Sequence, residues 1–105
     1  MPTELSAAAG AQARWLAMRQ EAVALNVANS AQPGFRAREA PSFATVLGAL
    51  DGAGTGVDPA RAILPSRNTV DVAAQMIEGS EVGRAHRINA AVTGAFHRMA
   101  LMVAQ

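Results

Sequence analysis

Apolar side chains recur at helical spacing over residues 5–30, a stretch that holds no proline and a single glycine. Leu5, Leu16 and Val27 are each 11 residues apart. Eleven residues return an α-helix to within about 20° of the same face, so this spacing predicts a nearly straight helix without the drift of a left-handed coiled coil. At 1.5 Å per residue that helix is about 39 Å long.

A series with the same spacing lies near the C-terminus: Ile77, Ile88 and Met99. No proline interrupts this part of the chain, so we expect a second straight helix over residues 70–105, about 53 Å long. Asn68 is expected to cap the free amides of its first turn, and Asp71 suits the positive end of the helix dipole. Both ends of the chain therefore predict long helices that need long partners.

Residues 31–69 differ in composition, because they hold four of the five prolines and five of the nine glycines. Ser42 can cap a short helix over Ser42–Leu50. A short strand can form at Arg36–Glu39 or Arg61–Leu64. We expect the rest of this segment to be irregular, and mobile without a partner.

The apolar content of the chain is high but consists of small side chains. Half of the 105 residues are apolar, yet 25 of these are Ala and only 28 positions carry Val, Ile, Leu, Met, Phe or Trp. A chain of this length has room for one domain, 1–105, and its own core is thin. This composition favours an all-α fold whose helices bury small side chains against neighbours.

Charge and candidate ligands exclude several function classes. Nine Arg and eight acids are spread along the chain without the clustered basic face that nucleic-acid binding requires, and Cys is absent. His86 and His97 are 11 residues apart and cannot share one metal ion. Glu78 and Glu81 are expected on a solvated or salt-bridged helix face with nearby arginines. We therefore expect no catalytic site, cofactor or metal.

The N-terminus has no basic region followed by a leucine-rich run, which argues against a cleaved secretory signal peptide. No run approaches the roughly 18 apolar residues that a membrane span needs. By itself this pattern indicates a cytoplasmic protein that is not embedded in a membrane.

Residues 24–35 read Ala-Leu-Asn-Val-Ala-Asn-Ser-Ala-Gln-Pro-Gly-Phe. This segment resembles the N-terminal signature of bacterial flagellar axial proteins, in which a long helix ends in Asn-x-x-Asn and is followed by Pro-Gly and an aromatic residue. The matching residues are Asn26, Asn29, Pro33, Gly34 and Phe35. A second segment, Asn68-Thr69-Val70-Asp71, resembles the corresponding point in proximal rod proteins of the FlgB type. The two segments occur in the order of that family.

The resemblance implies an architecture and a role. The N- and C-terminal helices of such rod proteins pair antiparallel as a coiled-coil-like hairpin, and many subunits pack side by side around a tube. Subunits are exported through the flagellar type III channel without a cleaved signal peptide and reach the periplasmic rod of the basal body. The implied partners are other copies of the chain, adjacent rod proteins of the FlgC and FlgF type, and a FliE-type adaptor.

We expect the assembly interface to be formed by large apolar residues of both helices: Leu5, Trp15, Leu16, Val23, Val27, Ile77, Ile88, Phe96 and Met99. Gly79 and Gly83, one turn apart, favour close approach of another helix over a simple weak spot. The segment from Asn26 to Phe35 is expected to set the conformation of the turn, although taken alone its asparagines suit ordinary fraying of a helix end. The alternative is a cytoplasmic helical hairpin that dimerises as an adaptor or regulator.

Overall fold

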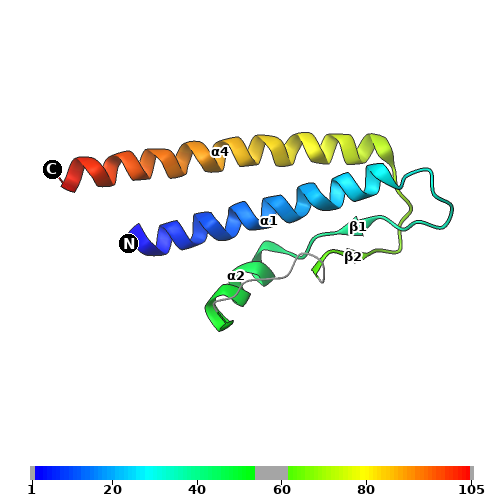
Figure 1. Ribbon diagram of the computed structural model, residues 1–105, viewed down its shortest axis with the longest axis horizontal. Coiled ribbons are helices and arrows are strands. Elements are labelled where there is room, and N and C mark those ends of the chain that lie inside the picture. Colours follow the sequence, from blue (N-terminus) through cyan, green and yellow to red (C-terminus); the bar gives the residue numbers. More distant parts are fainter. Residues whose placement is uncertain (1, 54–61, 105) are drawn as a thin grey trace.

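Two long antiparallel helices form most of the molecule, which we describe from a computed structural model (Figure 1). The structure describes residues 2–53 and 62–104. Helix α1 spans Pro2–Ala28 and helix α4 spans Val72–Ala104, and both chain ends lie at the same end of the pair. The all-α hairpin predicted from the sequence is therefore confirmed, and α1 begins one turn earlier than expected. No described helix is long and apolar enough to cross a membrane.

Helix α1 is the central element of the fold. Helix α4 packs along one side of it, and the segment between the two helices folds back onto its other side (Figure 1). Six residues of α1 are buried, whereas Val82 is the one buried residue within Val72–Ala104. The buried members of α1 are Ala11, Leu16, Met18, Ala22, Val23 and Asn26.

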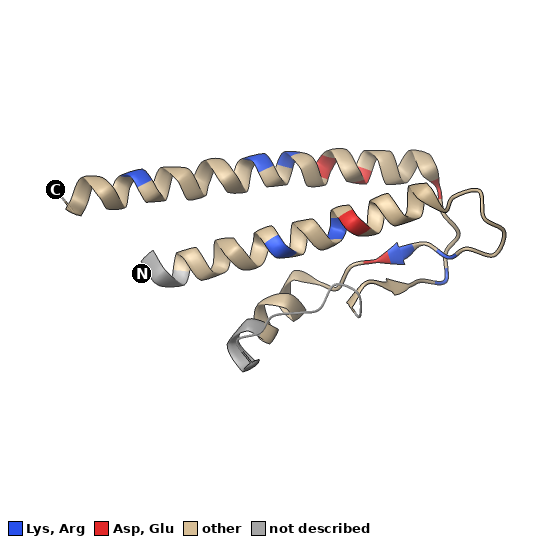
Figure 2. Cartoon of the chain, viewed as in Figure 1, with Lys and Arg blue, Asp and Glu red and all other residues tan. Residues whose placement is uncertain are grey.

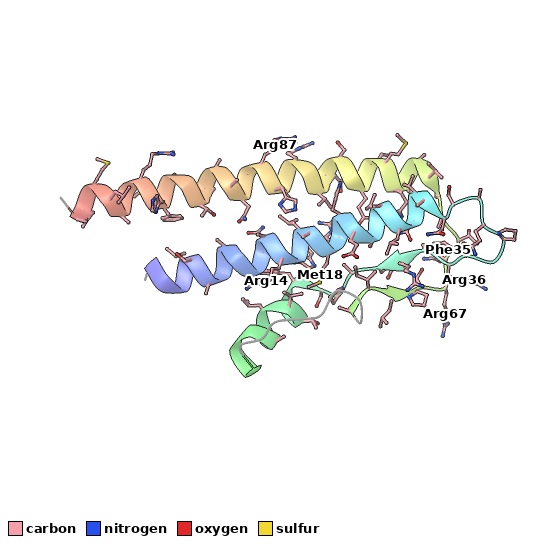
Figure 3. The ribbon with its side chains drawn as sticks, in the orientation of Figure 1. Arg14, Met18, Phe35, Arg36, Arg67 and Arg87 are labelled. Carbon is pink, nitrogen blue, oxygen red and sulfur yellow. The ribbon has the colours of Figure 1, made fainter. Side chains whose placement is uncertain are left out.

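The middle segment contributes a compact core against α1. Met18 and Ala22 of α1 form a buried cluster with Val46 and Ile63. Figure 3 shows Met18 on the side of α1 that faces this segment. This side of α1 thus holds one buried apolar cluster, while Leu16 and Val23 are also buried and lie outside it. Residues 54–61, which include Gly54 and Gly56, lie outside the described residues.

Helix α2 spans Phe43–Ala53 and begins as the sequence predicted. The Ser42 hydroxyl accepts a hydrogen bond from the Thr45 amide at 3.2 Å, which is the geometry of an N-cap. The helix continues three residues beyond the expected end at Leu50. Its first turn is attached to α1 by Trp15, whose indole N–H donates to the Pro41 carbonyl at 2.8 Å.

A two-stranded antiparallel ribbon follows the same side of α1. Strand β1, Arg38–Glu39, pairs with strand β2, Leu64–Pro65. The pairing continues past β1, because the Ala37 amide donates to the Asn68 carbonyl and the Ser66 amide donates to the Ala37 carbonyl, both at 2.8 Å. Both stretches considered for short strands therefore contribute to one ribbon, and the second strand begins three residues later and ends one residue later than expected.

Helix α4 begins at Val72, and its N-cap is Asp71 rather than Asn68. The Asp71 carboxylate accepts a hydrogen bond from the Ala74 amide at 3.3 Å, and its carbonyl accepts from the Gln75 amide at 3.0 Å. The cap expected at Asn68 was wrong because the Asn68 carbonyl is already the acceptor for the Ala37 amide in the ribbon. Tertiary pairing thus delays the helix by one turn.

Candidate functional site

The first motif asparagine connects three elements at the turn end of the hairpin. Asn26 is 1% exposed and is the one buried polar side chain among the described residues. Its Nδ2 donates to the Arg38 carbonyl and to Gln75 Oε1, both at 3.0 Å, and its Oδ1 accepts from the Arg38 amide at 2.7 Å. Asn26 therefore joins α1, β1 and α4, and is not the frayed helix end that local reasoning favoured.

The second motif asparagine has only a local role in the single chain. Asn29 Nδ2 donates to the Leu25 carbonyl at 2.8 Å, and the Ser30 hydroxyl donates to the Val27 carbonyl at 2.9 Å. The same two carbonyls also accept backbone hydrogen bonds, from the Asn29 amide at 3.1 Å and the Ser30 amide at 3.3 Å, so the side chains add second bonds at the helix end. Asn29 therefore contacts only its own helix end in the single chain.

The Pro-Gly pair reverses the chain immediately after α1. The Phe35 amide donates to the Gln32 carbonyl at 3.2 Å, and Gly34 has a φ of 80°. Proline at the second position and a positive φ at the third are the features of a type II turn, which requires glycine or asparagine at that third position. The turn directs Phe35 and the following residues back toward α1.

The two motif segments meet at this end of the hairpin. The Arg36 guanidinium donates to the Arg67 carbonyl at 2.6 Å, next to the Ala37–Asn68 pair. Figure 3 shows Phe35, Arg36 and Arg67 together beyond the ends of the helices. We call this joint, residues 26–38 with 66–75, the closed end. The resemblance found in two distant stretches of sequence therefore corresponds to one structural site.

A cavity of about 670 Å³, lined by both polar and apolar groups, adjoins the closed end between the ribbon and the helices. Arg19 lies within it, with its Nη2 3.4 Å from Glu78 Oε1 and its guanidinium carbon 5.0 Å from the centre of the Trp15 ring. Glu78 thus pairs across the hairpin rather than with the arginines of its own helix. Figure 2 shows the acidic positions of α4 near its start and the arginines further along.

The described residues contain no group of three His, Asp or Glu side chains placed to hold a metal ion. The arginine, the carboxylate and the amides of the cavity are used in contacts that join α1 to α4 and to the ribbon. These contacts hold the hairpin and the ribbon together.

Close approach of the two helices occurs at one of the two glycines expected there. A Cβ atom placed on Gly79 would lie 3.3 Å from Val23 Cγ1, which is tighter than an ordinary contact. A Cβ atom on Gly83 would meet only the Arg87 guanidinium of its own helix, at 3.7 Å. The prediction of close packing is confirmed at Gly79, while Gly83 has only an ordinary contact within its own helix.

The nine residues expected at the assembly interface fall into three groups. Leu16 and Val23 are buried inside the chain, and Trp15 is half-buried against the middle segment, with its ring 5.5 Å from that of Phe43. The other six are exposed in the single chain: Leu5, Val27, Ile77, Ile88, Phe96 and Met99. A role for these residues between chains stays a prediction.

The face of α4 that touches α1 was missed by the apolar pattern because it is partly polar. Gln75, Glu78 and Asn89 all bond to α1, with Val82 buried on the same side. At 3.6 residues per turn, the Ile77–Ile88–Met99 series lies about 100–140° around the axis from Val82. The only sequence signal for the true contact face was the pair of glycines.

An apolar groove separates the helices at the other end of the hairpin, which we call the open end. It encloses about 520 Å³ and is lined by both helices, with Leu5 from α1 and Phe96, Met99 and Val103 from α4 among its residues. The last hydrogen bond between the helices before it runs from Asn89 Nδ2 to the Ala9 carbonyl at 3.4 Å. The hairpin is thus tied by polar contacts at one end and lined by apolar side chains at the other.

These features describe a helical hairpin whose helix α4 exposes many large apolar side chains. No family model and no solved structure matches it. The chain is 32% identical to the flagellar basal body rod protein FlgB of Agrobacterium fabrum (strain C58 / ATCC 33970), and the alignment covers 96% of this chain and 92% of the relative. The chain therefore belongs to the FlgB family of flagellar basal body rod proteins.

Proposed function

We propose that this chain is a structural subunit of the proximal rod, which assembles through its terminal helices after type III export and catalyses no reaction. The observation that carries the proposal is the apolar surface of α4. Ten large apolar side chains of this helix are exposed, and several are more than half accessible: Val72, Met76, Ile77, Ile88, Val92, Phe96, Met99, Leu101, Met102 and Val103. Soluble monomers rarely expose apolar surface on this scale, and such patches mark contact sites.

The exposed side chains of α4 are arranged to suit a long, straight neighbour. Ile77, Ile88 and Met99 repeat every 11 residues along one side of the helix and are all exposed, and Met99 also lines the apolar groove between α1 and α4. A straight apolar stripe of about 33 Å requires a partner helix of similar length. Another copy of this chain or a homologous rod subunit offers such a helix, whereas a compact globular partner does not.

The contrast between the two ends of the hairpin supports ordering of the subunit during assembly. The closed end is satisfied by its own hydrogen bonds, while the open end leaves apolar groups of both helices in water. Fixing these helix ends costs conformational entropy that burial against a neighbour offsets. Subunits would therefore complete their helices as they insert beside further copies and adjacent FlgC-type, FlgF-type or FliE-type proteins of the periplasmic rod.

The test is a charged replacement in the middle of the apolar stripe. Ile88→Glu, made in cells that lack their own copy of the chain, is expected to leave expression unchanged and to abolish motility and recovery in purified basal bodies. Ser80→Glu places the same charge on another exposed part of α4 and is the matched control, with motility retained. Normal motility of Ile88→Glu, or equal loss in both variants, contradicts the proposed contact face.

The adaptor interpretation predicts a different behaviour of the purified chain. A hairpin that dimerises in the cytoplasm would sediment as a stable dimer with a sharp, concentration-dependent melt and would be absent from basal bodies. A rod subunit would be monomeric at the same concentrations and present in basal bodies. Circular dichroism and sedimentation across a concentration range, with immunoblots of basal bodies, separate the two.

A further inference from the structure

Gly79 and Gly83 of α4 can each accommodate the Val23 side chain of α1. Val23 of α1 lies against Gly79, where an added Cβ would be only 3.3 Å from its Cγ1. Gly83 lies four residues further along α4, about one helical turn, and likewise has no side chain that would block Val23. Sliding α4 along α1 by one turn, about 6 Å, would place Val23 against Gly83. The contact between Val23 and a glycine of α4 is therefore compatible with two registers.

The rest of the apolar contact does little to distinguish these registers. Of the buried apolar residues of α1 outside the cluster with the middle segment, Ala11 has a small side chain, and Leu16 and Val23 are the larger ones. Apolar patterning specifies register strongly only where large side chains fit individual gaps, and α4 buries just Val82 within Val72–Ala104. A hairpin built on this contact alone would populate more than one alignment.

The polar contacts do distinguish the registers. In the observed alignment Asn26 meets Gln75, and Arg19 meets Glu78. After a one-turn slide Asn26 would face Gly79 and Arg19 would face Val82, so the buried carboxamide would lose its partner on α4. A buried amide without a partner is strongly unfavourable. The same slide would pull the start of α4 away from the ribbon, where Ala37 bonds to Asn68.

We propose that Asn26 sets the register of the hairpin, holding Val23 on Gly79 and excluding the alternative alignment on Gly83. Asn26 acts as a positioning residue, because its contacts choose between alignments that apolar packing leaves nearly equivalent. The ribbon takes part, since Arg38 satisfies the other two hydrogen-bonding positions of the same carboxamide. This inference concerns contacts inside one chain and holds whatever the chain assembles with.

The test measures the register directly. The chain has no cysteine, so a pair introduced at Ala24 and Arg98, both exposed and on different helices, can carry two spin labels. Pulsed electron paramagnetic resonance then gives the distance between them. The labelled chain with Asn26 intact is expected to show one narrow distance. Asn26→Leu is expected to add a second population, shorter by about 5–6 Å because α4 moves by one turn toward the closed end.

A second substitution separates register from general loosening. Gly83→Ala places a methyl group where Val23 would lie in the alternative register. In the observed register this methyl group meets only the Arg87 side chain, so the substitution alone should leave the distance between the spin labels unchanged. Combined with Asn26→Leu, it should remove the shorter population. A merely structural role for Asn26 would give broadening that Gly83→Ala does not reverse, and that result overturns the proposal.

The remaining outcomes are also decisive. A single unchanged distance in Asn26→Leu overturns the proposal, as does a broad distribution in the chain that keeps Asn26. If circular dichroism shows that Asn26→Leu is unfolded, Gln75→Leu takes its place, since it removes the α4 partner and leaves the Arg38 contacts intact. The shorter population is then expected in Gln75→Leu, and its absence overturns the proposal.

Discussion

The carboxamide of Asn26 pairs with both backbone groups of Arg38, accepting from its amide at 2.7 Å and donating to its carbonyl at 3.0 Å. A side chain at the end of α1 thus occupies the position that a neighbouring strand would take beside β1. The second donor hydrogen of the same group reaches Gln75 on α4. One residue therefore satisfies the free side of the ribbon and joins it to both long helices.

Asn26→Asp should destabilise the fold because a carboxylate can accept from the Arg38 amide but cannot donate to the Arg38 carbonyl or to Gln75. The charge would be buried against two oxygen atoms. We expect a loss of about 2–4 kcal/mol in the free energy of unfolding, measured by urea titration with circular dichroism. Asn29→Ala, at the half-buried motif asparagine whose side chain has only a local contact, is the control and should cost about 0.5–1 kcal/mol. Equal losses in the two variants would contradict the assigned role of Asn26.

Gly34→Ala and Gly48→Ala should change the stability of the fold in opposite directions. Gly34 has a φ of 80°, a conformation that costs an L-residue about 1–2 kcal/mol. Gly48 lies inside α2 with nothing within 4 Å of an added Cβ, so alanine there should stabilise the helix by up to about 1 kcal/mol. Thermal unfolding of the two variants beside the parent chain checks the prediction. A stabilised Gly34→Ala variant would contradict the type II turn.

Gly79→Ala should be less stable than Gly83→Ala by about 2 kcal/mol. Both replacements gain the same helix propensity, but only the first places a methyl group 3.3 Å from Val23. Val23 is β-branched and buried, so it has little freedom to move aside. Denaturant midpoints of the two variants give the difference in the free energy of unfolding. Equal midpoints would contradict the close contact between Val23 and Gly79.

Trp15→Phe should weaken the attachment of the middle segment to α1. The replacement keeps an aromatic ring near Phe43 but removes the N–H that bonds to the Pro41 carbonyl, for a loss of about 1–2 kcal/mol. Hydrogen exchange is expected to accelerate over residues 37–46 more than over α4. Phe96→Leu, at an exposed position of α4, is the control and should stay within about 0.5 kcal/mol of the parent. Uniform acceleration along the whole chain would contradict this localised role.

Local structure could be predicted from the sequence where a residue contacts its own neighbours in the chain. The cap at Ser42 and the Pro33–Gly34 turn follow from backbone geometry and short-range hydrogen bonds, and both were predicted. The start of α4 was placed wrongly because the Asn68 carbonyl is used by Ala37, a residue 31 positions earlier. Contacts of that range leave no trace in local patterning.

The sequence by itself determined the two long helices, the breaks between them and the family motifs, because helix periodicity, capping and turn preferences are local properties of the chain. Only the tertiary structure decided that α1 lies at the centre, that α4 meets it through the side bearing Gln75 and Val82, and that Asn26 is buried rather than frayed. Those outcomes depend on which polar groups find partners when distant segments meet. In a chain where almost half of the apolar residues are alanine, hydrogen bonds between such segments choose among arrangements that the hydrophobic pattern alone leaves open.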